Sequence, residues 1–162
     1  MPYVERTGLV VTGIWATQQY AGQEYLPDGH ADLLPTLAEY KATARKEVDI
    51  EAGIARSRFP SPGFLVEQEY KHAESGASSY VAAGYTGTVP VCVQDWATVN
   101  GWTAQQAADD IIATAAVWYG IMDIIRGHRL IGKKAIEVAI DAAGVDTEKA
   151  LAIANLRGVI PQ

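Results

Sequence analysis

The stretch SRFPSPGFLVEQEYKHAE, residues 57–74, decides how the middle of the chain folds. A charged run with helical periodicity ends there, and a second run with the same periodicity begins at Phe64. Pro60 and Pro62 cannot donate to a helix, and each disfavours the helical conformation of the residue before it. The sequence therefore predicts two helices separated by a short, stiff break at Pro60-Pro62. Because short connections commonly join antiparallel helices, we expect an αα-hairpin over residues 32–83.

Apolar residues on both sides of the break recur at spacings of three, four and seven, which is typical of amphipathic helices. The stripe before the break consists of Leu34, Leu37, Ala44, Val48, Ala52 and Ala55. The stripe after it consists of Val66, Tyr70, Ala73, Ala77 and Tyr80. Since the first stripe is made mostly of small residues, we expect its helix to bury little apolar surface and to be held weakly.

The second half of the chain carries the longest predicted element. A glycine-rich loop over residues 83–90 precedes a short helix over 91–99, and Thr103 with Gln106 forms a capping-box pattern. Apolar residues then follow at alternating spacings of four and three, which predicts a long helix over 104–143 with coiled-coil-like spacing. Gly127 and Gly132 leave open whether that helix bends. Gly144 is expected to end it, and Thr147 to begin a last short helix over 147–157.

The first 30 residues have a different character. Residues 2–20 are rich in Val, Ile, Trp and Tyr, and two Thr-Gly pairs punctuate them, which indicates a small β-hairpin. We therefore expect an α+β protein, mostly helical, with a β-hairpin docking unit over residues 1–30 and a helical domain over 31–162. A hairpin of this size is only marginally stable alone, so it must pack against helices or against a partner.

Composition excludes several classes of function. The 13 Lys and Arg against 19 Asp and Glu give a net charge of −6, which argues against a nucleic-acid partner. No apolar run approaches the roughly 20 residues that cross a bilayer, and the N-terminus lacks a signal-peptide pattern. We expect a soluble protein made inside the cell, without membrane insertion. The single cysteine, Cys92, allows no intrachain disulfide.

No group of residues points strongly to catalysis. The segment His72-Ala73-Glu74, followed by Pro90-Val91-Cys92, has part of a zinc-deaminase pattern, but Asp95 stands where the second cysteine would be. On a helix His72 and Glu74 would also point about 200° apart. We expect no catalytic residues, no metal site and no cofactor. The rival interpretation is a small helical enzyme that binds a metal or a ligand through His72, Glu74 and Cys92.

Aromatic residues are better candidates for partner contact, because they dominate the energetics of interfaces. In the hairpin region the candidates are Trp15, Tyr20 and Tyr25. In the long helix the run AAVWYGIMDII, residues 115–125, is apolar on more than one face, and its candidates are Trp118, Met122 and Ile125. These three are expected to pack against the αα-hairpin or to support a homo-oligomer. For Trp96 and Trp118, core packing is the simpler interpretation.

Four segments resemble small bacteriophage and prophage proteins encoded alongside tail-fibre genes. They are YVERTGLVVTGIWATQQYAGQEYLPDGHADLLPTLAEY (3–40), VDIEAGIARSRF (48–59), QEYKHAESGASSYVAAGY (68–85) and WTAQQAADDIIATAAVWYGIMDIIRGHRLIGKKAI (102–136). The N-terminal segment matches through the Gly13-Ile14-Trp15-Ala16 run and the acidic turn around Leu26-Pro27-Asp28. The resemblance covers residues 2–143, and residues 144–162 depart from it.

This resemblance implies a non-enzymatic protein of the phage tail. Such a protein would bind a tail-fibre, baseplate or tail-tip subunit as an accessory structural component and would lie in the virion tail. The alternative is a tail-fibre assembly chaperone that acts in the host cytoplasm and is not retained in the virion. A regulatory or anti-defence phage protein is a third interpretation, and the residues themselves do not separate it from the other two.

Overall fold

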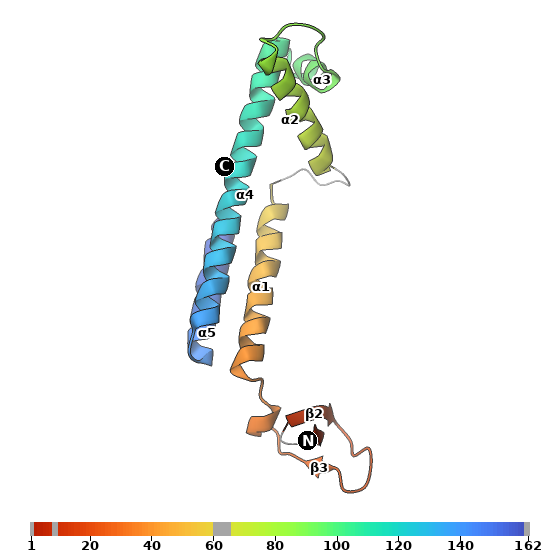
Figure 1. Ribbon diagram of the computed structural model, residues 1–162, viewed down its shortest axis with the longest axis vertical. Coiled ribbons are helices and arrows are strands. Elements are labelled where there is room, and N and C mark those ends of the chain that lie inside the picture. The colour runs from red at the N-terminus through yellow and green to blue at the C-terminus, as the bar shows by residue number, and fades with distance from the viewer. Residues whose placement is uncertain (1, 8–9, 60–65, 161–162) are drawn as a thin grey trace.

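The computed structural model describes residues 2–7, 10–59 and 66–160 (Figure 1). The strands are β1 (Tyr3–Thr7), β2 (Val10–Trp15) and β3 (Glu24–Tyr25), and a 3-10 helix η1 (Ala31–Leu33) follows them. Five helices complete the fold, namely α1 (Leu37–Ser57), α2 (Val66–Ala82), α3 (Val91–Asn100), α4 (Ala104–Val138) and α5 (Ala142–Arg157). The expected fold class, α+β and mostly helical with a long helix near the C-terminus, is confirmed.

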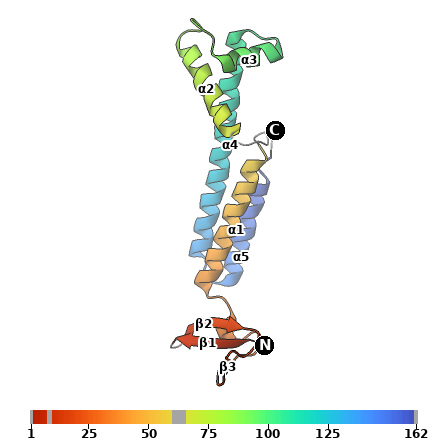
Figure 2. The same ribbon diagram turned by 90° about the vertical axis from the view of Figure 1, so that its right-hand side faces the viewer.

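Helix α4 is the axis of the molecule. Helices α1 and α5 pack along its C-terminal half, and α2 and α3 pack on its N-terminal half (Figures 1 and 2). Helices α1 and α2 run in the same direction along α4, one after the other. Within the described residues they do not pack against each other, so the expected αα-hairpin of residues 32–83 does not form. The predicted break at Pro60-Pro62 itself lies outside the described residues.

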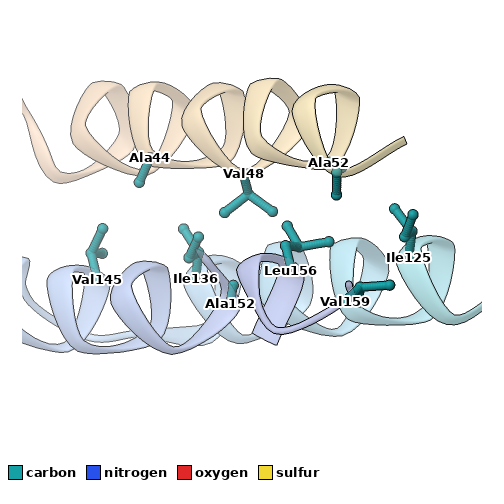
Figure 3. Close-up of a cluster of buried hydrophobic side chains, with 10 residues drawn as sticks. Ala44, Val48, Ala52, Ile125, Ile136, Val145, Ala152, Leu156 and Val159 are labelled. Carbon is teal, nitrogen blue, oxygen red and sulfur yellow. The ribbon is translucent and has the colours of Figure 1, made fainter. Parts of the chain in front are cut away.

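The larger core fills the space between α1, α4 and α5 (Figure 3). Its largest fully buried side chains are Ile125, Ile136 and Leu156, and small residues of α1 such as Ala44 and Ala52 face them. Fully burying one Ile or Leu side chain contributes about 1.5–3 kcal/mol. The small residues on α1 instead let its backbone lie close to α4 and α5. This close approach explains why the apolar stripe of α1 consists mostly of small residues.

Charged side chains connect the helices around this core. Asp49 of α1 accepts hydrogen bonds from Arg129 Nη1 at 2.9 Å and from Lys133 Nζ at 2.5 Å, both on α4. Glu51 of α1 is 7% exposed and accepts from Arg157 Nη2 of α5 at 3.1 Å. A carboxylate buried to this extent needs such a partner, because losing it would leave an uncompensated charge.

A second, smaller core lies between α2, α3 and the first turns of α4. Its buried residues are Ala77, Tyr80, Val93, Ala97, Ala107 and Ala108. Tyr80 packs edge-on against Tyr85, with ring centroids 5.8 Å apart. The two cores therefore lie on the same long helix but involve different partner helices.

A capping box begins α4, and the N-cap of α5 follows soon after α4 ends. Thr103 and Gln106 form the expected capping box, and the helix continues through Gly127 and Gly132. It ends at Val138 rather than at residue 143, and α5 begins at Ala142 rather than at 147. The reason is Asp141, whose Oδ1 accepts a hydrogen bond from the Gly144 amide at 2.7 Å and caps α5. Gly144 and Thr147 lie inside α5 and are not caps.

The N-terminal sheet has the antiparallel order β2-β1-β3 and lies beyond the first turn of α1 (Figure 2). Arg6 of β1 binds Glu24 of β3 and Asp32 of η1, with Arg6 Nη2 2.6 Å from Asp32 Oδ2. The pairing of β1 with β2 shifts between Glu5 and Arg6, so Thr12-Gly13 marks a bulge inside β2 rather than a second turn. Among the described elements outside the sheet, η1 is the one that packs against it.

Candidate partner-binding surfaces

A row of three aromatic residues crosses the N-terminal sheet. Tyr3 of the central strand is paired directly with Trp15 of β2 and with Tyr25 of β3. Directly paired residues project to the same face of a sheet, so Trp15, Tyr3 and Tyr25 form one surface, here called the aromatic row. The Tyr3 and Tyr25 rings pack edge-on with centroids 5.7 Å apart. Tyr25 is 42% exposed, while Tyr3 and Trp15 are half-buried.

Two of the three were predicted as interface residues from the sequence, and Tyr3 was missed. The pairing of the strands places Tyr3 between Trp15 and Tyr25. This pairing cannot be deduced from the sequence of residues 3–25 alone. Tyr20, the third predicted residue of this region, is 51% exposed but lies in the loop between β2 and β3, outside the aromatic row. The structure therefore brings Trp15 and Tyr25 together and leaves Tyr20 apart.

The Arg6 ion pairs stabilise the strands that carry the aromatic row. Side-chain hydrogen bonds from Arg6 lower the pKa of the Glu24 and Asp32 carboxyls. The same bonds raise the pKa of Arg6, and the bond to Glu24 contributes more than the bond to Asp32. Because one guanidinium joins β1, β3 and η1, the row is held on a connected unit even though the sheet is small.

A groove lies at the other end of the molecule, between α2, α3 and α4, with a volume of about 530 Å³. Its aromatic lining comes from Tyr70, Trp96, Trp118 and Tyr119. Trp96 is 41% exposed, so the expectation that it packs in the core is wrong. Carboxylates surround this lining, and they include Glu67, Glu69, Glu74, Asp95 and Asp110.

Hydrogen bonds from aromatic residues fix two of these carboxylates. Tyr119 donates its hydroxyl to Glu74 Oε2 at 2.5 Å, which raises the pKa of Tyr119. Trp96 Nε1 donates to Asp110 Oδ2 at 2.9 Å. Each bond connects α4 to one of the two helices that face it, so the groove is a preformed feature of the helical packing.

The predicted metal and thiol candidates all border this groove. His72, Glu74, Cys92 and Asp95 are among its lining residues. Across the described ranges, however, no three His, Cys, Asp or Glu side chains form a group that could hold a metal ion. Glu74 is engaged by Tyr119, and Cys92 Sγ lies 3.8 Å from the Ala73 carbonyl oxygen in a half-buried position. The residues are brought to one groove without forming a ligand set.

The predicted interface residues of α4 have three different environments. Trp118 is half-buried, borders the groove and packs edge-on against Phe59 with centroids 6.4 Å apart. Met122 is half-buried against the larger core. Ile125 is fully buried inside that core, so its assignment to a partner interface is wrong. The apolar spacing identified the right helix face. That face is covered by α1, which belongs to the segment expected to pack there, and by α5, which was not expected there.

Comparisons of the chain with protein-family models, with curated proteins and with solved structures found no match. Among the helices of the described ranges, none combines the length and the apolar character that crossing a membrane requires.

Proposed function

We propose that this chain is a non-enzymatic phage tail-associated protein that binds tail-fibre, baseplate or tail-tip subunits as an accessory structural component. The resemblance to tail-associated proteins motivates the choice of partner. The observation that carries the contact role is the accessible surface of the chain, 10606 Å² for 17.4 kDa. A compact monomer of this mass exposes only about 7,900 Å². The excess is larger than the roughly 800 Å² that each partner contributes to a standard interface.

The aromatic row is the surface that would dock on the tail subunit. It presents one exposed tyrosine and two half-buried aromatic rings on a unit that packs against η1 and not against α1–α5 within the described residues. Aromatic anchors of this kind dominate binding energies, and a unit set apart from the helices can enter a partner without disturbing them. The helical part then acts as a spacer whose far end carries the groove.

Mass spectrometry of purified phage or tail particles tests the proposal. An accessory component is expected at a fixed copy number per particle. The alternative, a tail-fibre assembly chaperone, predicts that the chain is missing from particles and co-purifies with the fibre protein from lysate. Absence from the particles together with absence from fibre-protein complexes would contradict both.

The groove favours one second candidate, a small helical enzyme that binds a metal or a ligand. Its volume of about 530 Å³ lies within the range of small-molecule sites, and His72, Glu74 and Cys92 line it. Metal analysis of the purified protein discriminates between the candidates. Stoichiometric zinc that is lost in His72→Ala would favour this candidate, and metal-free protein would count against it.

A further inference from the structure

Helix α4 carries a regular apolar stripe on a face that none of the described helices covers. Val117, Ile124, Ile131 and Val138 follow one another at intervals of seven residues. They are 64%, 52%, 71% and 61% exposed, whereas Ile125 and Ile136 of the same helix are fully buried. We call these four residues the heptad stripe. A coiled coil has apolar residues at two positions of each heptad. The stripe supplies one of these positions, and the residues three positions further on are Gly120, Gly127 and Lys134.

Two glycines lie beside the heptad stripe, and the packing within the chain does not require a glycine at either position. Gly120 and Gly127 each follow a stripe residue by three positions, and a Cβ atom built on either would meet nothing within 4 Å. Gly132 is different, because a Cβ there would overlap the Cβ of Ala152 on α5. Glycine is the least favourable residue in a helix interior apart from proline. Gly120 and Gly127 therefore indicate the close approach of something outside the chain.

We propose that α4 pairs with α4 of a second copy of this chain, antiparallel, about a two-fold axis between residues 125 and 126. In this register Ile124 lies opposite Gly127 of the other copy, and Ile131 lies opposite Gly120. At the ends, Val138 faces Ala113, and Val117 faces the aliphatic stem of Lys134. The proposal is independent of the proposed function and holds whether or not the chain binds a tail.

The antiparallel direction follows from matching large residues to small ones. A parallel pair would set Gly120 against Gly120 and Gly127 against Gly127, which leaves voids between the helices. It would also place Lys134 against Lys134, two like charges in one layer. In the antiparallel register each isoleucine fills the space above a glycine, and the lysines are separated along the helix.

A second copy is the occupant because the heptad stripe is complementary to itself. A two-fold contact uses the same patch on both subunits, and here the knobs and the holes both come from residues 113–138. The stripe spans ~32 Å at a rise of 1.5 Å per residue. That length, together with the surface excess described above, is enough for an interface of standard size. The sheet lies near the C-terminal end of α4, so the pair would carry its two aromatic rows at opposite ends (Figure 1).

Sedimentation of the purified full-length chain tests the pairing. The natural sequence is expected to sediment as a dimer at micromolar concentration. The double variant Ile124→Asp/Ile131→Asp should raise the dimer dissociation constant at least ~100-fold, because each copy loses two apolar anchors. The matched control is Ile50→Asp/Ile54→Asp on α1, where the side chains are 63% and 46% exposed and the dimer should persist. A monomeric natural chain, or equal effects of both double variants, would overturn the proposal.

A second variant guards against misfolding of the aspartate variant. In Gly120→Ala/Gly127→Ala the new methyl groups occupy the proposed holes, while alanine favours the helix of each copy. This variant should keep its helical circular dichroism and dissociate at least ~10-fold more readily. An unchanged dissociation constant would show that the glycines do not face the partner.

Cross-linking tests the direction. Two proteins in a Cys92→Ser background, one with Ala113→Cys and one with Val138→Cys, are mixed and oxidised with oxidised glutathione. The proposed register predicts a disulfide that joins position 113 of one copy to position 138 of the other. A predominance of 138-to-138 disulfides would indicate parallel helices and would overturn the proposed register.

Discussion

At the residue scale, the glycines of α4 show how one residue type serves two purposes. Gly132 is buried where α4 meets Ala152 of α5, so the absence of a side chain is required for the helices to approach. Gly127 faces open space within the chain. In the sequence both are simply glycines within a helical pattern, and both were considered as sites of a bend. The packing distinguishes them, and the sequence could not.

Alanine substitutions of these two glycines should have opposite effects on the isolated chain. We expect Gly132→Ala to lower the free energy of unfolding by about 1–3 kcal/mol, because its Cβ would force α5 away. Gly127→Ala should raise it by up to about 1 kcal/mol through better helix propensity. Urea unfolding at concentrations low enough for the chain to be monomeric measures both. Equal destabilisation by the two variants would contradict the difference in packing.

Acid sensitivity is a second property decided by single residues. Burial tends to raise the pKa of Asp49, but hydrogen bonds from Lys133 and Arg129 outweigh it, so the pKa is lowered. A hydrogen bond from Tyr40 and one from Lys149 lower the pKa of Asp146. Because these pKa values are lower in the folded chain than in the unfolded one, the stabilisation is present above about pH 5 and is lost as pH falls.

We therefore expect the free energy of unfolding to decrease between about pH 5 and pH 3, and Asp49→Asn to reduce this dependence. The side chain of Asp49 is 40% exposed, so solvent screening keeps its contribution below about 1 kcal/mol. Urea unfolding across this pH range compares the variant with the natural chain. The same slope for both would show that Asp49 does not contribute.

At the element scale, local capping signals predicted the start of the long helix and failed at its end. The capping box of Thr103 and Gln106 is complete within four residues, and the structure contains it. At the other end Gly144 was expected to end the helix and Thr147 to begin the next one, and Asp141 was not recognised as a cap. The apolar spacing continued through Ala143, so the prediction placed the helix end too late. Asp141 reverses the chain earlier, because α5 must turn back to bury Val145 and Leu156.

Removing the cap at residue 141 should therefore cost more than a change at the residue first predicted as the cap. We expect Asp141→Ala to lower the free energy of unfolding by about 1 kcal/mol, because the Gly144 amide loses its acceptor. Thr147→Ala should change it by less than about 0.5 kcal/mol, because Thr147 only donates to the Ala143 carbonyl within α5. Chemical denaturation of the two variants decides this. A larger effect at residue 147 would restore the predicted boundary.

At the scale of the whole molecule, the sequence predicted the helices, the N-terminal hairpin and the fold class, but it did not predict β3, η1 or how the helices are paired. Helices α1 and α2 were expected to pair because a short break separates them. Instead each packs on α4, which offers apolar positions over 35 residues and leaves no reason for α1 and α2 to fold back on each other. The same long-range packing buried Ile125, exposed Trp96 and brought Tyr3 between Trp15 and Tyr25.

The proposed docking role is tested most directly by disrupting the aromatic row in the phage that the proposal implies. Tail particles would be purified from phage that carry Trp15→Ala/Tyr25→Ala. The control is Trp102→Ala, because Trp102 lies far from the sheet and is about as exposed as Tyr25, at 41% against 42%. Mass spectrometry then counts the chain per particle. We predict a fixed copy number for the natural and control chains and a loss of at least ~10-fold for the row variant. Equal retention of all three chains would contradict docking through the aromatic row, and absence of the natural chain from particles and fibre complexes would contradict the tail assignment.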